Sequence, residues 1–159
     1  MLILSLVFVA AVCSQDQAQS YLSEGTEFTF PEQQSTDFII VLDRSGSMRG
    51  DKLEQAKQAA TTLVTQLGRG DQAAIVGFDS RSRVYSDLTD NITMLQEAIQ
   101  GITVGDFTQY GTGITAGAEL LNGRPAVIIF MSDGKPDDMQ DQIFAAVDAV
   151  LKKNVCIFT

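Results

Sequence analysis

The side chains of this sequence that could carry chemistry are carboxylates and hydroxyls in three short segments. They are Asp43, Ser45 and Ser47 in the first segment, Thr112 in the second and Asp133 in the third. Together they offer five oxygen donors and no nitrogen or sulfur. Oxygen donors of this kind suit hard cations such as Mg²⁺, Mn²⁺ or Ca²⁺. Because octahedral Mg²⁺ takes about six ligands, a site built from these residues needs water or a partner to complete it.

The composition removes most other chemistries. The chain has 159 residues and no histidine, which excludes His-based acid–base catalysis, catalytic triads and His-ligated metals. Its two cysteines, Cys13 and Cys156, are too few for a zinc cluster or a disulfide scaffold within the chain. Eleven Lys and Arg against twenty Asp and Glu give a net charge of −9. That charge argues against a nucleic acid, or an anionic membrane, bound through a general basic surface.

The three segments are flanked by stretches whose patterns predict strands and helices. The runs at 38–42 and 126–131 are continuous and apolar, as in strands buried on both faces of a parallel sheet. Further strands are predicted at 73–78, 83–85 and from 155, and amphipathic helices at 53–67, 92–102, 114–121 and 143–151. This alternation predicts an α/β fold, a doubly wound and mostly parallel sheet with helices on both faces.

The order of these elements predicts that the polar segments converge. In open α/β sheets, ligands bind beyond the carboxyl ends of the strands, where the strand order reverses. Right-handed crossovers would place the strands at 38–42 and 126–131 side by side at that point. Asp43 and Asp133 follow those strands, and Thr112 lies just before a predicted helix. Two neighbouring threonines, Thr108 and Thr115, leave the register of this hydroxyl open.

At these residues the sequence resembles the von Willebrand factor type A domain. Asp43-Arg44-Ser45-Gly46-Ser47-Met48, Gly111-Thr112 and Met131-Ser132-Asp133-Gly134 are similar to the three parts of that family's metal-ion-dependent adhesion site. The resemblance covers roughly residues 37–159 and implies a Rossmann-like fold. It implies that Ser45, Ser47 and Thr112 coordinate the metal, whereas Asp43 and Asp133 act largely through water. It also implies a module that is not an enzyme and that binds a partner protein through an Asp or Glu carboxylate.

Other interpretations of the same residues remain open. Asp43 and the two serines are also typical of local turn hydrogen bonding, and Asp133-Gly134 is an ordinary turn pair. A strand that ends in Asp43 beside a metal also suits an aspartyl nucleophile in phosphoryl transfer. Against this, Ser45 stands where such phosphatases usually carry a second acid. A further alternative is a domain of this family with a purely structural role.

The N-terminal residues predict export. The apolar run from Leu2 to Val12 is shorter than the ~20 residues of a membrane span and indicates a signal peptide at 1–14. The alternatives are a lipoprotein acylated at Cys13 and a buried N-terminal strand. We therefore expect a secreted or extracellular protein of the adhesion or matrix type, with no membrane insertion by this segment. Attachment to the cell surface through sequence beyond Thr159 is compatible with this expectation.

The remaining expectations concern domain limits and modification. A polar lead-in at 15–36 precedes the domain at 37–159, and the chain stops within a predicted strand. We therefore expect the domain to continue beyond Thr159 with one more strand and one or two helices. Asn91-Ile92-Thr93 is an N-glycosylation sequence that matters only if the protein is exported, and Asn91 is equally placed to cap a helix.

Overall fold

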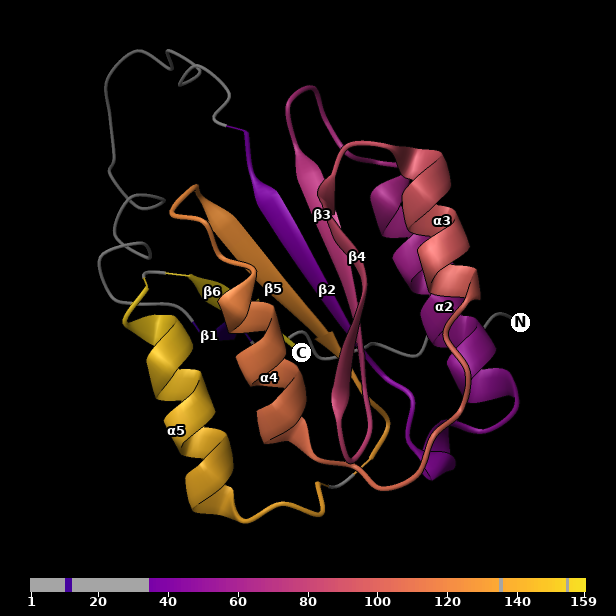
Figure 1. The fold of residues 1–159 in the computed structure, drawn as a ribbon, viewed down its shortest axis with the longest axis vertical. Helices are drawn as coiled ribbons and strands as arrows, with labels where there is room; N and C mark the ends of the chain where they lie inside the picture. The colour runs from indigo at the N-terminus through magenta and orange to yellow at the C-terminus, as the bar shows by residue number, and fades with distance from the viewer. Residues whose placement is uncertain (1–10, 13–34, 135, 154) are drawn as a thin grey trace, which may run out of the picture.

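The apolar runs form the centre of a six-stranded sheet in a computed structural model that describes residues 11–12, 35–134, 136–153 and 155–159 (Figure 1). The strand order is β1-β6-β5-β2-β3-β4. The strands are β1 (Ala11–Val12), β2 (Asp37–Asp43), β3 (Gln72–Phe78), β4 (Ser82–Thr89), β5 (Ala126–Met131) and β6 (Cys156–Phe158). The four central strands are parallel, and β4 and β1 pair antiparallel at the two edges.

This topology confirms the predicted doubly wound, mostly parallel sheet. β2 and β5 are direct neighbours, with Ile39 opposite Ile128 and Leu42 opposite Met131, so the strand order reverses between them as expected. The two residues of β1 pair with β6. The rest of the signal peptide predicted at 1–14, and the lead-in as far as residue 34, lie outside the described residues.

Helices cover both faces of the sheet. The first face carries α2 (Asp51–Val64) and α3 (Ile92–Gln100), and the second carries α4 (Tyr110–Glu119) and α5 (Gln140–Leu151). Because side chains alternate along a strand, β2 contributes to two cores. Ile40 and Leu42 pack in the core on the α2 and α3 side, and Ile39 and Val41 in the core on the α4 and α5 side. None of the described helices is long and apolar enough to cross a membrane.

Two elements differ from the predicted bounds in ways that matter for the site. β4 runs from Ser82 to Thr89 rather than over 83–85, because it pairs along most of β3. α4 begins at Tyr110 rather than near 114, so the expectation that Thr112 precedes this helix is wrong. The early start has a tertiary cause, since the Asp138 carboxylate accepts the backbone N–H groups of Tyr110 and Gly111 at 3.2 and 2.7 Å.

The helix α3 begins directly after Asn91, the residue that the sequence places as a possible N-cap. The side chain of Asn91 accepts a hydrogen bond from the backbone N–H of Met94 at 3.2 Å, as an N-cap residue does. The capping role of Asn91 is therefore confirmed, and its glycosylation stays a prediction. A short 3₁₀ helix, η1 (Gly46–Met48), follows β2 and leads into α2.

Candidate metal centre

Four of the five predicted ligands form one hydrogen-bonded cluster at the carboxyl ends of β2 and β5. Asp43 Oδ1 accepts the backbone N–H of Ser45 at 2.7 Å, and the hydroxyls of Ser45 and Ser47 lie 3.0 Å apart. The Ser47 hydroxyl donates to Asp133 Oδ1 at 3.0 Å, across 86 residues of sequence. Because that bond uses the only proton of Ser47, the hydrogen bond between the two serines has Ser45 as its donor.

The cluster has a buried side and an open side. Asp43 and Ser45 are fully buried, whereas Ser47 and Asp133 lie at the surface. Partial burial alone would raise the pKa of Asp133, but hydrogen bonds from Lys52 and Ser47 outweigh it and hold that pKa below its ordinary value. Asp133 is therefore ionised at neutral pH. The open side thus presents a carboxylate and a hydroxyl to solvent.

Asp43 is fixed by residues that the sequence pattern did not single out. The Ser132 hydroxyl donates to Asp43 Oδ2, so both carboxylate oxygens of Asp43 are hydrogen-bonded within the protein. The Tyr110 hydroxyl lies 2.9 Å from Ser132 Oγ and 2.5 Å from the carbonyl oxygen of Gly134. Burial raises the pKa of Tyr110 above its ordinary value, as do the charges of Asp43, Asp133 and Asp138, although the hydrogen bond with Ser132 lowers it. This hydroxyl therefore stays protonated at neutral pH.

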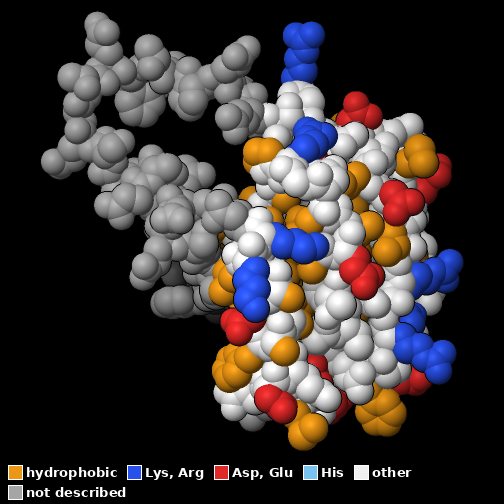
Figure 2. Space-filling view, turned by 60° about the vertical axis from the view of Figure 1, so that its left-hand side comes forward, with side chains coloured by type: hydrophobic (Ala, Val, Ile, Leu, Met, Phe, Trp, Pro, Cys, Tyr) orange, Lys and Arg blue, Asp and Glu red, His pale blue; other side chains and the backbone are white. Residues whose placement is uncertain are grey.

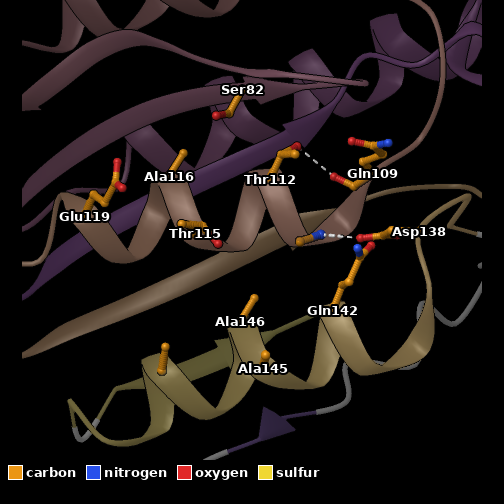
Figure 3. A pocket seen from close by; sticks show the side chains of 12 residues that line it. Ser82, Gln109, Thr112, Thr115, Ala116, Glu119, Asp138, Gln142, Ala145 and Ala146 are labelled. Carbon is orange, nitrogen blue, oxygen red and sulfur yellow. Dashed lines mark hydrogen bonds between the residues drawn. The ribbon is translucent and has the colours of Figure 1, made fainter.

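The hydroxyl of Thr112 is engaged within α4 rather than with these four residues. Its hydroxyl donates to the carbonyl oxygen of Gln109 at 2.8 Å, within the first turn of α4 (Figure 3). Its side chain lines a cavity of about 630 Å³ between α4 and α5. The structure therefore does not bring Thr112 into hydrogen-bond contact with the cluster.

The loop that precedes α4 is hydrogen-bonded to the loop that follows β2, and it carries another threonine. The backbone N–H of Gly46 donates to the carbonyl of Asp106 at 2.6 Å, and that of Gly105 donates to the carbonyl of Arg44 at 2.6 Å. Thr108 follows in the same loop and is 6% exposed. Thr108 is therefore still the alternative to Thr112 that the sequence leaves open.

Two aspartates after β5 hold this loop in place. Asp137 and Thr108 exchange a pair of hydrogen bonds, from the Thr108 N–H to Asp137 Oδ2 at 2.8 Å and from the Asp137 N–H to the Thr108 carbonyl at 2.6 Å. Asp138 caps α4, as described above. The segments after β5 and before α4, which lie about 28 residues apart, are thus joined mainly by hydrogen bonds from backbone N–H groups to aspartate side chains.

The oxygen spacing within the cluster fits a hard divalent cation. Octahedral Mg²⁺ holds oxygens at about 2.0–2.1 Å, which places adjacent ligands roughly 2.9–3.0 Å apart. The distances from Ser45 Oγ to Ser47 Oγ and from Ser47 Oγ to Asp133 Oδ1 are both 3.0 Å. Within the described residues no three Asp, Glu, Cys or His side chains gather as a metal-binding group. Any cation held here therefore depends on the hydroxyls as well as the two carboxylates.

The sequence matches the model of the von Willebrand factor type A domain over residues 38–135. The chain belongs to this family. The match includes the loop after β2, the start of α4 and the end of β5, which are the three segments that surround the cluster.

The similar proteins are longer than this chain. Human inter-alpha-trypsin inhibitor heavy chain H1 is 26% identical over 115 residues, which are 63% of this chain and 13% of that protein. A von Willebrand factor type A structure from Catenulispora acidiphila has a TM-score of 0.70 at 21% identity and covers 77% of this chain and 32% of its own. The N-terminal domains of the pilus tip protein Mfa5 from Porphyromonas gingivalis have a TM-score of 0.60 at 22% identity, covering 68% and 22%. The two structures show the fold alone.

The distribution of charged side chains on the surface is consistent with the acidic composition. On the face shown in Figure 2, Lys and Arg side chains lie interspersed with Asp and Glu rather than gathered into one broad basic area. Arg44 and Arg83, which sit in the loops and strands near the site, each have an intramolecular partner. Arg44 pairs with Asp79 at 2.6 Å, and the guanidinium of Arg83 lies 4.9 Å from the ring centroid of Tyr85.

Proposed function

We propose that this domain binds a partner protein through a divalent cation, Mg²⁺ or alternatively Mn²⁺ or Ca²⁺, held at the cluster of Asp43, Ser45, Ser47 and Asp133. A carboxylate of Asp or Glu from the partner completes the coordination. The observation that carries the proposal is the 3.0 Å spacing of the hydroxyl and carboxylate oxygens on the open side. The bound cation would supply positive charge that attracts a partner's carboxylate.

The burial pattern supports this division of roles. Asp43 is fully buried and has both oxygens hydrogen-bonded, so its charge lies behind the cluster. Ser47 and Asp133 lie at the surface, so the exposed side of a cation held there is free for an incoming ligand. Asp43 is therefore expected to act on the cation through its charge and through water, in agreement with the family resemblance.

The same observations disfavour phosphoryl transfer by Asp43. A nucleophilic carboxylate must be able to reach the phosphorus of its substrate. Asp43 is 0% exposed, and hydrogen bonds from the Ser45 N–H and the Ser132 hydroxyl hold it in that buried position. We therefore propose a binding module rather than an enzyme, and we expect no hydrolysis of p-nitrophenyl phosphate above background.

A threonine hydroxyl from the α4 side completes the donor set in this proposal; the family resemblance implies Thr112, and Thr108 is the alternative. Thr108 lies in the loop that contacts the segment after β2, whereas the hydroxyl of Thr112 is used within α4. Alanine variants at the two positions separate these assignments. Thr112→Ala should weaken metal binding and Thr108→Ala should leave it near the wild-type value; the reverse result would assign the role to Thr108.

Isothermal titration of the chain with Mg²⁺ and Mn²⁺ tests the metal site. Wild type should release or absorb heat with a saturable profile, and Asp43→Ala should abolish it. Asp148→Ala is a matched control, because it removes one exposed carboxylate from the last turn of α5. Equal metal binding by Asp43→Ala and wild type would refute the site.

Partner binding is tested with immobilised synthetic peptides that contain one Asp. Capture should require Mg²⁺ or Mn²⁺, disappear in chelator and fail when the peptide's Asp is replaced by Asn. The loss of one charge-assisted contact of this kind costs a few kcal/mol, or on the order of a hundredfold in affinity. Peptide capture that persists unchanged in chelator would contradict the proposed mechanism.

We further propose that the protein is secreted or extracellular. The apolar run at 2–12 supports this. Protein recovered from the culture medium should begin near Ser14 or Gln15.

A further inference from the structure

One basic side chain lies directly at the open side of the cluster. Lys52, in the first turn of α2, places its ammonium group against Asp133 Oδ2. The other oxygen of the same carboxylate, Asp133 Oδ1, accepts the Ser47 hydroxyl. Each oxygen of Asp133 therefore has one protein partner, and one of these two partners carries a positive charge.

The position of this ammonium follows from the packing of the Lys52 stem. Lys52 lines a largely apolar groove of about 760 Å³ together with Met48, Ala56 and Met131. Lysine side chains commonly lay their methylene groups on apolar surface and keep the charged end at the polar edge. Here that edge is Asp133, which also borders the groove.

The ammonium group of Lys52 is paired with Asp133 but is exposed enough to move away from it. The Lys52 side chain is 57% exposed and that of Asp133 is 19% exposed, so water can solvate the ammonium if it swings away. By contrast, Asp43 and Ser45 at the back of the cluster are buried and fixed. Among the described residues, Lys52 is the one cation that forms a salt bridge with any of the four clustered side chains, and it does so with Asp133.

We propose that Lys52 is a tethered cation that competes with the divalent ion for Asp133 and so sets the metal affinity of the site. This inference rests on the proposed function, because it concerns the same metal centre. Without metal, Lys52 neutralises Asp133. When the divalent ion binds at Ser47 and Asp133, like charges repel at short distance, and the ammonium moves into solvent.

The expected effect is a gain of affinity when the ammonium is removed. Lys52→Met keeps the apolar stem in the groove and removes the charge. An exposed ion pair contributes little, and the added repulsion between two cations is also modest in water. Lys52→Met should therefore bind Mn²⁺ about three- to tenfold more tightly than wild type. Lys52→Arg, which keeps the charge, should bind it with an affinity close to wild type.

Isothermal titration with Mn²⁺ of wild type, Lys52→Met, Lys52→Arg and the control Lys152→Met tests the proposal. Lys152 follows α5, and its removal changes the net charge equally. A gain confined to Lys52→Met supports the proposal, as does binding by Lys52→Met when wild type shows none. Equal affinities for wild type and Lys52→Met, or an equal gain in Lys152→Met, would overturn it while leaving the metal site intact. Absence of binding in all variants would refute the proposed function as well.

A second readout guards against misfolding of the variant. Thermal unfolding in chelator should show Lys52→Met within a few degrees of wild type, because an exposed ion pair stabilises the fold only weakly. At an intermediate Mn²⁺ concentration, the upward shift of the midpoint should be larger for Lys52→Met than for wild type. A smaller shift would contradict competition by Lys52.

Discussion

Replacing Tyr110 with Phe removes a single hydroxyl between the candidate metal centre and the core. The ring remains, so its edge-on packing against Phe78 and Phe130, with centroids 5.9 and 5.0 Å apart, is kept. The hydrogen bonds to the Gly134 carbonyl and to Ser132 Oγ are lost. The variant therefore isolates what the hydroxyl contributes from what the aromatic ring contributes.

The size of the effect follows from the exposure of the partners. A net hydrogen bond contributes about 0.5–1.5 kcal/mol to stability. Gly134 and Ser132 are both partly exposed, so water can replace the lost donor in part. We expect a loss of about 1 kcal/mol in the free energy of unfolding, or roughly 3 °C in Tm for a chain of this size. Because Ser132 in turn fixes Asp43, we also expect Mn²⁺ affinity to fall about fivefold.

Urea unfolding in chelator and isothermal titration with Mn²⁺ measure the two effects separately. Tyr85→Phe is the matched control. Tyr85 lies on β4 near the guanidinium of Arg83, and its hydroxyl makes no hydrogen bond within the described residues. If Tyr110→Phe matches Tyr85→Phe in both stability and Mn²⁺ affinity, the link from Tyr110 through Ser132 to Asp43 has no energetic role.

Two further predictions concern charge and burial. Arg124→Met should destabilise the fold by about 2–4 kcal/mol in urea unfolding, because it leaves the buried carboxylate of Asp37 without the cation that lies 3.1 Å away. The double variant with Asp37→Asn should recover part of this loss. If it recovers none, the buried charge of Asp37 is not the cause. Burial raises the pKa of Tyr110 above its ordinary value of 10.0. The protonated hydroxyl of Tyr110 therefore contributes its full stabilisation of the fold below pH 10, and this contribution is lost as the pH rises through the pKa of the folded state. Absorbance titration at alkaline pH should show that the Tyr110→Phe variant lacks a tyrosine transition above pH 10 that wild type has.

The parts of this site that lie next to predicted strands could be found from the sequence. Asp43 and Asp133 follow two continuous apolar runs, and such runs fix both the strands and their ends. Ser45 and Ser47 come within four residues of Asp43, so local geometry keeps them beside it. These four residues meet in the structure as the order of strands predicted. The bound metal itself stays a prediction.

The parts that depend on distant residues could not be found in the same way. The start of α4 is set by Asp138, 27 residues further along the chain, and no local capping residue marks it. The sequence pattern therefore predicts a start for this helix that is too late. Lys52 was missed for a similar reason, because its partner Asp133 lies 81 residues away.

The register between β2 and β5 ties the site to the two cores. Leu42 stands opposite Met131, so the next residues along the two strands, Asp43 and Ser132, end up at the same level and form their hydrogen bond. A slip of one residue would shift them by about 3.3 Å and turn every following side chain to the other face of the sheet. That slip would also carry Ile39 and Val41 out of the core on the α4 side. The free energy of core packing therefore holds Asp43 against Ser132, and substitutions in these strands that change the register should weaken the site even where they touch none of its polar groups.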